Sequence, residues 1–438
     1  MTKHIHFIGI GGIGMSGLAR YYLHEGWRVS GSDREPSVIT KALEAEGVEF
    51  YSEQRADNIT HQGSESLPDM VVYTEAMPKD HPEMQAAQAL DIPMLNYFQA
   101  LGQVANQYYL IAVAGTHGKT TTTAMLADIL EEASYDPTVI VGSLRAKTGS
   151  NFRPGTSKYA VVEACEYKRD FLHLTPDVLV ITNIELEHVD YYKDLADVQS
   201  AFRELAQSVP EEGYIVTDTA NEAIAPCLEG VQATVVDYRE HLNLTMPLRQ
   251  PGLHIRLDAA AASAVADTLS VEKSYIEEAL QNFAGTWRRF EYKGNIVADG
   301  GGLVPVYDDY GHHPTEIRAT LAGIRELYPD KKIQLVFQSH TYSRTHDLFT
   351  DFIDVLADAD AVTLLPIYAA REENTSGVTS EQLAEALNEQ STPTTVIATM
   401  AAAALHIKET VRDGEVVVVM GAGPVTEVAT QLTAGTIV

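Results

Sequence analysis

The segment Ala114 to Thr120 combines residue types and a spacing that suit phosphate binding. It reads A-G-T-H-G-K-T, between the apolar run Tyr109 to Val113 and a helical pattern from Thr122 to Ala133. A strand, a glycine turn and a helix in this order direct several backbone N–H groups and the positive helix end at one point. Lys119 could neutralise the β- and γ-phosphates of a nucleoside triphosphate, and the Thr120 hydroxyl could hold magnesium. The alternative is a glycine turn without a ligand.

Two further apolar strands after this loop end in polar residues. The run Tyr159 to Val162 leads into Glu163, and the run Val178 to Thr182 leads toward His188. Ligands gather beyond the carboxyl ends of the strands in an open parallel sheet, so we expect Glu163 and His188 to lie near Lys119. A carboxylate and a neutral imidazole there suit a divalent metal ion beside a triphosphate. The alternative is that His188 caps a loop and Glu163 pairs with a surface lysine.

A second glycine-rich turn lies near the start of the chain. A strand pattern leads into G-I-G-G-I-G over Gly9 to Gly14, and an apolar helical pattern follows. This is G-x-G-x-x-G in a strand–turn–helix context, and Asp33 stands 19 positions after Gly14, where a ribose-binding carboxylate could lie. The pattern predicts a dinucleotide-binding half-fold, although any diphosphate suits the same amides. A later strand, Met70 to Tyr73, leads into Thr74 and predicts another βα unit facing the same ligand.

The last third of the chain again alternates strands with helical patterns. We expect strands at Val304 to Tyr307, Ile333 to Phe337, Ala361 to Leu365, Thr395 to Ile397 and Glu415 to Met420. The first two lead into segments that carry Tyr310, His312, His340 and Arg344. Imidazoles, a phenol and a guanidinium at adjacent strand ends could fix a small substrate that bears a carboxylate, with Arg344 as a bidentate clamp.

The order of these elements indicates an α/β protein of three domains. With 438 residues, the chain exceeds the usual size of one or two domains. We expect a Rossmann-like domain over residues 1–105, a central P-loop-type ATPase domain over 106–290, and a second Rossmann-like domain over 291–438.

Composition and charge exclude several classes of partner. There are 61 Asp and Glu residues against 31 Lys and Arg residues, so nucleic acid or an anionic membrane would meet a repulsive field. No secretion signal and no stretch of 18 consecutive apolar residues is evident, so we expect a cytoplasmic protein without membrane insertion. The two cysteines, Cys165 and Cys227, exclude a disulfide framework, and we expect both to be small buried side chains.

The motifs together resemble the Mur ligases of peptidoglycan synthesis over essentially the whole chain. Seven ordered segments carry the resemblance: Gly9 to Gly17, Gly115 to Thr122, Glu163 to Tyr167, Thr182 to Tyr191, Arg288 to Phe290, Asp308 to Glu316 and Phe337 to Thr345. The resemblance implies that the first domain binds a UDP-sugar instead of NAD, that the central domain binds ATP and Mg²⁺, and that the last domain binds an amino acid. Within the family the chain is most similar to the branch that adds L-alanine to UDP-N-acetylmuramate.

The resemblance also implies a role for individual residues. UDP-sugar contacts are implied for Gly9, Gly11, Gly12, Ile13, Gly14, Asp33 and Thr74. ATP contacts are implied for Gly115, Thr116, His117, Gly118, Lys119, Thr120, Thr121, Arg289 and Asp309, and magnesium ligation for Thr120, Glu163 and His188. The amino-acid site is implied for Tyr310, His312, His340 and Arg344. The catalytic set is then Lys119, Glu163, His188, His340 and Arg344.

The implied reaction proceeds through an acyl phosphate of the lactyl carboxylate, which the alanine amine then attacks. Lysine, magnesium and helix amides suffice for this chemistry, without a serine or cysteine nucleophile. One stretch departs from the family pattern G-x-H-N-x-x-N-A, because Ile255 and Asp258 stand where asparagines are usual. This departure puts nucleotide affinity, or the purine specificity, in question.

Three other readings stay open from the sequence. A ligase of the same family that recycles a murein tripeptide would share the ATP residues and differ in the amino-acid domain. A nicotinamide-dependent dehydrogenase would explain the first glycine turn but would leave Lys119 unused. A catalytically silent UDP-sugar-binding regulator would not need Lys119, Glu163 and His188 together. We expect a monomer or a weak homodimer.

Overall fold

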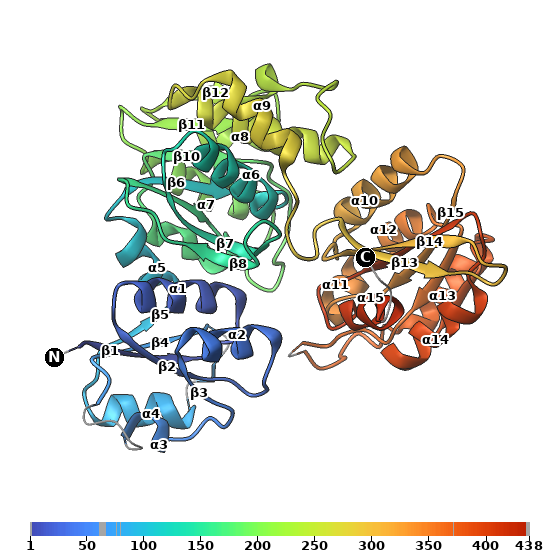
Figure 1. The fold of residues 1–438 in the computed structure, drawn as a ribbon, viewed down its shortest axis with the longest axis horizontal. Helices are drawn as coiled ribbons and strands as arrows, with labels where there is room; N and C mark the ends of the chain where they lie inside the picture. The colour runs from blue at the N-terminus through green and yellow to red at the C-terminus, as the bar shows by residue number, and fades with distance from the viewer. Residues whose placement is uncertain (1, 61–66, 76, 79, 371, 435–438) are drawn as a thin grey trace. The chain divides into compact units, whose positions relative to one another are not determined.

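The fold was examined in a computed structural model, which describes residues 2–60, 67–75, 77–78, 80–370 and 372–434 (Figure 1). The described residues form three sheets in two compact units. The first unit comprises Met1–Met246 and Leu257–Ala284, and the second comprises Pro247–Arg256 and Gly285–Val438. The three-domain α/β fold expected from the sequence is confirmed, with the first two sheets sharing one unit.

The first sheet has five parallel strands in the order β3-β2-β1-β4-β5. Its strands are β1 (His4–Ile8), β2 (Arg28–Ser32), β3 (Glu49–Tyr51), β4 (Met70–Tyr73) and β5 (Met94–Asn96), and its helices are α1 (Ile13–His24), α2 (Val38–Glu46), α3 (Asp57–Thr60), α4 (Pro82–Ala89) and α5 (Tyr97–Ala105). All five residues of β1 are buried, because α1 and α4 cover opposite faces of the sheet (Figure 1). The glycine turn therefore follows a central strand.

The second sheet has seven strands in the order β12-β11-β10-β6-β9-β7-β8, and β8 runs antiparallel to β7. Its strands are β6 (Tyr109–Ala114), β7 (Thr138–Arg145), β8 (Ser150–Arg153), β9 (Tyr159–Glu163), β10 (Val178–Ile181), β11 (Tyr214–Thr217) and β12 (Thr234–Asp237). Its helices are α6 (Lys119–Glu132), α7 (Leu195–Gln207), α8 (Leu253–Thr268) and α9 (Lys273–Asn282), with short 3₁₀ turns η1 (Tyr167–His173), η2 (Ala225–Leu228) and η3 (Tyr238–His241). Since β6 pairs with both β9 and β10, the ends of these strands flank the phosphate loop.

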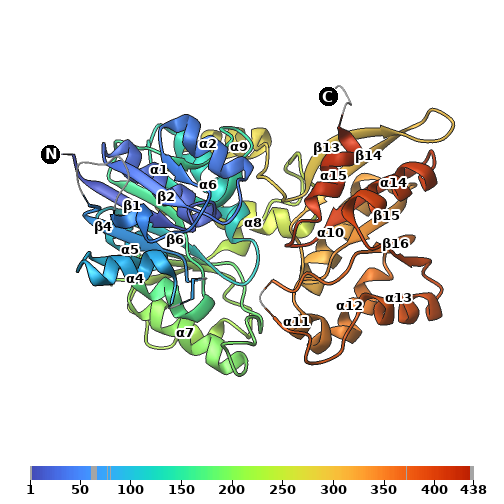
Figure 2. The same ribbon diagram turned by 90° about the horizontal axis from the view of Figure 1, so that it is seen from below.

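The third sheet has the order β13-β14-β18-β15-β16-β17, with β13 antiparallel to β14. Its strands are β13 (Glu291–Val297), β14 (Leu303–Asp309), β15 (Lys332–Phe337), β16 (Ala361–Leu364), β17 (Thr394–Val396) and β18 (Glu415–Met420). Its helices are α10 (Pro314–Leu327), α11 (Tyr342–Asp347), α12 (Phe349–Leu356), α13 (Ser380–Glu389), α14 (Met400–Thr410) and α15 (Thr426–Thr433). Apolar residues of α10, α12 and α13 pack on one face of the sheet and those of α14 and α15 on the other (Figure 2).

The cores follow this division. A single cluster of buried apolar side chains runs from the first sheet into the second, so the two sheets of the first unit share a core. The segments Pro247–Arg256 and 285–290, predicted as part of the central domain, belong to the compact unit of the third sheet. They contact each other, since Gln250 Nε2 donates to the Arg289 carbonyl at 2.7 Å. Helix α8 therefore begins in the second unit and continues in the first.

Among the described residues, no helix has the length and apolar character required to cross a membrane.

Candidate active site

The phosphate loop joins β6 to α6 in a shape that only glycine permits at two positions. Gly115 and Gly118 have φ angles of +134° and +83°, which lie in the left-handed region. A Cβ atom at Gly115 would lie 2.0 Å from Thr182 Oγ1. Asn183, which follows Thr182 after β10, accepts from His117 N at 2.9 Å through Oδ1 and donates to the His117 carbonyl at 3.0 Å. The end of β10 thus fixes the loop, a support that the sequence motif alone did not indicate.

Lys119, the first residue of α6, folds back over this loop. Its Nζ donates to the Thr116 carbonyl at 3.0 Å and lies 3.0 Å from Glu166 Oε2. Burial opposes the positive charge, but the carboxylate of Glu166, with smaller contributions from Cys165 and Glu163, outweighs it and raises the pKa of Lys119 above its usual range. Lys119 is therefore held as a cation at the mouth of the loop.

Thr120 and Glu163, two of the three predicted magnesium ligands, contact each other. The Thr120 hydroxyl donates to Glu163 Oε1 at 3.1 Å, and Gly142 N on β7 donates to Glu163 Oε2 at 2.8 Å. The neighbouring strands β6 and β9 place the two side chains together, since Val113 pairs with Glu163 in register. A hydroxyl and a carboxylate oxygen are the hard ligands that Mg²⁺ prefers.

His188, the third predicted ligand, groups instead with two carboxylates that the sequence analysis did not select. Its Nε2 lies 3.6 Å from Glu166 Oε1, and one ligand atom from each of Glu166, Glu187 and His188 lies within 4.8 Å of the others. Burial would raise the pKa of Glu166, but Lys119 and the bond with His188 outweigh it and lower that pKa. The position of Glu166, three residues after Glu163, was the available signal. The structure therefore describes two oxygen-rich groups near Lys119, one formed by Thr120 and Glu163 and one by Glu166, Glu187 and His188.

Asp258, one of the two departures from the family pattern, lies against the phosphate loop. It is buried on α8, and its Oδ1 accepts from the Thr122 hydroxyl at 3.2 Å. A Cβ atom at Gly118 would lie 2.3 Å from the same oxygen. A carboxylate therefore stands next to the amides at the start of α6. Ile255, the other departure, is buried in the second unit with 3% of its surface exposed.

A carboxylate from the residue after β2 binds the backbone of the N-terminal glycine turn. Asp33, which follows β2, accepts from Gly11 N through Oδ2 at 2.8 Å. Thr74 follows β4, and its N–H donates to the Ile8 carbonyl at 3.2 Å. Gly12 caps α1, and Ile13 and Gly14 form its first turn. The predicted UDP-sugar residues thus meet at the carboxyl ends of β1, β2 and β4.

The predicted amino-acid residues also meet, beyond β14 and β15 in the second unit. The His312 ring lies 5.4 Å from the Tyr310 ring and 5.8 Å from the His340 ring, between centroids. Arg344 Nη1 donates to His340 Nδ1 at 3.2 Å. Tyr368, which the sequence analysis did not select, adds its ring 5.6 Å from His340. It follows β16 in a segment without a recognisable motif, so the sequence carried no signal for it.

Arg289 and Asp309 are organised around Tyr310. The guanidinium carbons of Arg288 and Arg289 each lie 5.0 Å from the centre of the Tyr310 ring, a distance at which cation–π attraction operates. The buried carboxylate of Asp309 accepts from Phe290 N at 2.7 Å and from Gly311 N at 2.6 Å. Burial raises the pKa of Asp309, and Arg289 opposes that shift. Asp309 therefore fixes the backbone directly after Arg289 and directly after Tyr310.

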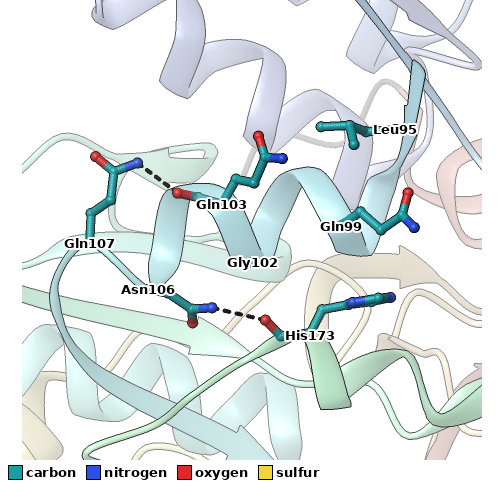
Figure 3. Close-up of a pocket in the computed structure, with 7 residues that line it drawn as sticks. All are labelled: Leu95, Gln99, Gly102, Gln103, Asn106, Gln107 and His173. Atoms are coloured by element: carbon teal, nitrogen blue, oxygen red, sulfur yellow. Dashed lines mark hydrogen bonds between the residues drawn. The ribbon is translucent and has the colours of Figure 1, made fainter. Parts of the chain in front are cut away.

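A hollow of about 440 Å³ lies elsewhere in the first unit, beside α5 and η1 (Figure 3). Amide side chains line much of it, but several of them stabilise backbone. Asn106 donates to the His173 carbonyl at 2.9 Å, and Gln107 donates to the Gln103 carbonyl at 2.6 Å (Figure 3). None of the predicted site residues lines this hollow.

Three family models match successive parts of the chain. Residues 4–109 match the family model "Mur ligase family, catalytic domain", residues 113–246 match "Mur ligase middle domain", and residues 288–423 match "Mur ligase, glutamate ligase domain". The chain is 40% identical to a UDP-N-acetylmuramate–L-alanine ligase of Agathobacter rectalis, over 98% of this chain and 97% of that protein. The chain belongs to the Mur ligase family.

Other members of the Mur ligase family agree with this assignment. A UDP-N-acetylmuramate–L-alanine ligase of Clostridium novyi is 38% identical over 97% of this chain and 96% of its own length. The crystal structure of a UDP-N-acetylmuramate–alanine ligase from Thermotoga maritima is similar with a TM-score of 0.82 and 27% identity, over 99% of each chain. A murein peptide ligase from Psychrobacter arcticus, 24% identical with a TM-score of 0.71 over 100% of this chain and 99% of its own, shares the fold.

Proposed function

We propose that this Mur ligase joins L-alanine to the lactyl carboxylate of UDP-N-acetylmuramate, at the cost of ATP, in the synthesis of peptidoglycan precursors. The observation that carries the proposal is the phosphate loop, in which Lys119 pairs with Glu166 at 3.0 Å beside the contact of Thr120 with Glu163. The names of full-length relatives at 38–40% identity support the choice of sugar and amino acid. We place the activity in the cytoplasm, in a monomer or a weak homodimer.

The proposed reaction has two steps. A carboxylate oxygen of the lactyl group attacks the γ-phosphorus of ATP, and the bond from that phosphorus to ADP breaks, which leaves an acyl phosphate. The alanine nitrogen then attacks the acyl carbon, loses a proton, and expels inorganic phosphate as the amide forms. Transfer of a phosphoryl group needs positioning and neutralisation of charge more than a covalent intermediate on the enzyme.

Lys119 and the loop amides supply the neutralisation. The ammonium group of Lys119 is kept charged by Glu166, so it serves as a donor and a cation at every pH near neutrality. The backbone N–H groups at the start of α6 point toward the same place because Gly115 and Gly118 adopt left-handed conformations. These groups would stabilise the charge that moves from the γ-phosphate to ADP.

The donor set around the loop fits Mg²⁺. Thr120 with Glu163 forms one group, and Glu166 with Glu187 and His188 forms another; both offer mainly oxygen ligands near Lys119. Thr120 and Glu163 would hold one Mg²⁺ ion, and Glu166, Glu187 and His188 would hold a second. Bound there, Mg²⁺ would neutralise the phosphate oxygens.

We propose different tasks for the two histidines at the amino-acid site, on the basis of their hydrogen bonds. His340 Nδ1 accepts from Arg344, so its proton lies on Nε2, which can donate to a carboxylate of the substrate. His312 Nδ1 lies 3.1 Å from the Tyr310 carbonyl and 3.4 Å from Glu316 Oε2, two acceptors that keep the proton on Nδ1. His312 Nε2 then carries the lone pair, and we assign it the proton of the attacking amine.

A product assay tests the proposal. The chain is incubated with ATP, magnesium and UDP-N-acetylmuramate, together with L-alanine, glycine, L-serine or the murein tripeptide. We expect alanine to react fastest, glycine to be roughly 10- to 200-fold worse because it lacks one methyl group, and the tripeptide to be rejected. Faster addition of the tripeptide would replace this proposal with the recycling ligase of the same family, and hydride transfer to a nicotinamide would replace it with a dehydrogenase.

Arg344→Lys provides a second test of the amino-acid site. A point charge cannot reproduce a two-pronged contact with a carboxylate, so the variant should lower kcat/KM for alanine, glycine and serine by the same factor. A change confined to one amino acid would show that Arg344 contacts the side chain and not the carboxylate.

A further inference from the structure

The hairpin of β7 and β8 contacts both ligand-binding regions of the first unit. From β7, Gly142 N donates to Glu163 Oε2 at 2.8 Å, and Arg145 forms ion pairs with Asp128 and Glu131 of α6, the helix that begins at Lys119. From β8, Asn151 contacts α1, the helix that follows the N-terminal glycine turn. One small element of the central domain is thus attached to the helices of both glycine-rich turns.

Asn151 is fully buried, and both ends of its amide are used. Its Nδ2 donates to the Ile13 carbonyl and to Ser16 Oγ, the latter at 3.0 Å. Its Oδ1 accepts from Arg20 Nη1 at 2.5 Å. Gly17 of α1 lies next to the Asn151 amide, and a Cβ atom at Gly17 would lie 3.2 Å from Asn151 Nδ2. A side chain of the central domain therefore binds the first turn of α1 directly.

Arg20 extends this contact to a second helix of the N-terminal domain. Its Nε lies 2.8 Å from Glu46 Oε2 and its Nη2 lies 2.9 Å from Glu46 Oε1, on α2. Arg20 is 6% exposed, and the Glu46 carboxylate compensates the charge of its guanidinium. Arg20 is thereby fixed at one end, so that it holds Asn151 at the other.

We propose that Asn151 is a positioning residue for the UDP-sugar, an inference that rests on the proposed function. The first turn of α1 contains Ile13, and its backbone amides are those assigned to the diphosphate. Directional bonds to the Ile13 carbonyl and to Ser16 fix the rotation and the height of that turn, which apolar packing alone would leave adjustable. The same hairpin holds Glu163, so Asn151 sets the sugar in place relative to the carboxylate beside the phosphate loop.

The test is Asn151→Ala, with Ser150→Ala as its matched control. Ser150 is the neighbouring residue of β8, and its hydroxyl accepts from Phe152 N within the strand. We expect Asn151→Ala to raise KM for UDP-N-acetylmuramate about 10-fold, as for the loss of one buried hydrogen-bond network, while KM for ATP changes less than about 2-fold. Ser150→Ala should leave both constants unchanged.

Arg20→Lys keeps a charge near Glu46 but removes the donor to Asn151, and it should raise the same KM by about 3-fold. This variant carries the test if Asn151→Ala does not fold. A lower melting temperature with an unchanged KM for the sugar would mean that Asn151 is merely structural and would overturn the inference. Calorimetric binding of UDP-N-acetylmuramate needs no turnover, so it still tests Asn151 if the wild-type chain forms no alanyl product and the proposed function fails.

Discussion

The two glycine-rich turns of the first unit share a strand–turn–helix shape but differ in how charge is arranged around them. The turn before α1 carries no lysine. The carboxylate beside it, that of Asp33, accepts a hydrogen bond from Gly11 N of the turn at 2.8 Å. The turn before α6 is followed directly by Lys119, and two carboxylates from the end of β9 and the residues after it face it: Glu166 at 3.0 Å from Nζ, and Glu163 at 3.1 Å from the Thr120 hydroxyl.

This difference corresponds to the difference between holding a phosphate and transferring one. Backbone amides and a helix end suffice to bind a diphosphate that does not react. A γ-phosphoryl group in transfer changes its charge distribution, which requires a fixed cation and ligands for metal ions. The shape of a glycine turn therefore indicates phosphate binding, and the charged residues brought to it from other strands indicate the reaction.

Lys119→Ala should lower turnover more than any other variant proposed here. If turnover did not fall, the contrast between the two glycine-rich turns would be wrong. Turnover should fall by at least about 10²–10³-fold, because a preorganised cation is lost from the transferred group. Binding of UDP-N-acetylmuramate should stay nearly unchanged, since the sugar is assigned to the other turn. Magnesium-dependent phosphate release and calorimetry are the measurements. Lys158→Ala is the control, because Lys158 lies over the Tyr109 ring at the opposite end of β6; phosphate release at the wild-type rate in Lys119→Ala would refute the loop assignment.

Glu166→Gln should lower kcat/KM by roughly 10- to 100-fold, as is typical when a carboxylate that supports a metal site is removed. The magnesium concentration needed for half-maximal rate should rise. Because Glu166 raises the pKa of Lys119, its loss should move the alkaline limb of the pH–rate profile to lower pH. Glu204→Gln, on the exposed side of α7, is the control, and an unshifted alkaline limb in Glu166→Gln would show that the pair does not set the charge of Lys119.

Asp258→Asn should have a smaller effect, in the direction of better binding. The variant keeps an oxygen for the Thr122 hydroxyl but removes a negative charge next to the amides that face the phosphates. A like charge at this range costs about 1 kcal/mol, so KM for ATP should fall about 5-fold. Ile255→Asn, the other family-like change, would put an amide in a buried position and should cost stability. An unchanged or higher KM in Asp258→Asn would mean that magnesium bridges the carboxylate to the nucleotide.

The variant Asp170→Asn changes a residue of η1, whose neighbour Phe171 lies in the core shared by the first and second sheets. Asp170 is 7% exposed, and among the described residues its Oδ2 has no hydrogen-bond partner. Burial, aided by Glu75, raises the pKa of Asp170 to about 7. Between about pH 4 and 7 the unfolded chain therefore ionises while the folded carboxyl keeps its proton, and wild-type stability falls as the pH rises.

The melting temperature of Asp170→Asn should equal that of the wild type near pH 4 and exceed it by about 2–4 °C above pH 7. Asp197→Asn is a control of opposite sign, because bonds from Lys193 N and Arg169 lower the pKa of Asp197. The melting temperature of Asp197→Asn should be below that of the wild type near neutral pH, and this difference should disappear as the pH falls. A pH-independent difference for Asp170→Asn would contradict the assigned pKa.

The strands and turns that carry ligands were predicted well from the sequence, and several strands at or next to the sheet edges were not. Thr74, Glu163 and His340 stand at or after the ends of β4, β9 and β15, which are largely buried and mostly apolar, a strong signal. The hairpin Thr138–Arg145 and Ser150–Arg153 and the antiparallel strand Glu291–Val297 were missed. They lie at or next to a sheet edge with mixed polar sequence, where a pattern of alternation is weak.

The sequence by itself determined the glycine turns, the lysine and threonine after the second turn, and the family, because these depend on residues adjacent in the chain. Only the tertiary structure decided that Glu166 instead of Glu163 pairs with Lys119, that His188 joins Glu166 and Glu187, and that Asn151 holds α1. The pairs Glu166–His188, Lys119–Glu166 and Ser16–Asn151 are 22, 47 and 135 positions apart in the chain. The register of neighbouring strands and the packing of helices on them place such residues together, and neither can be read from local spacing.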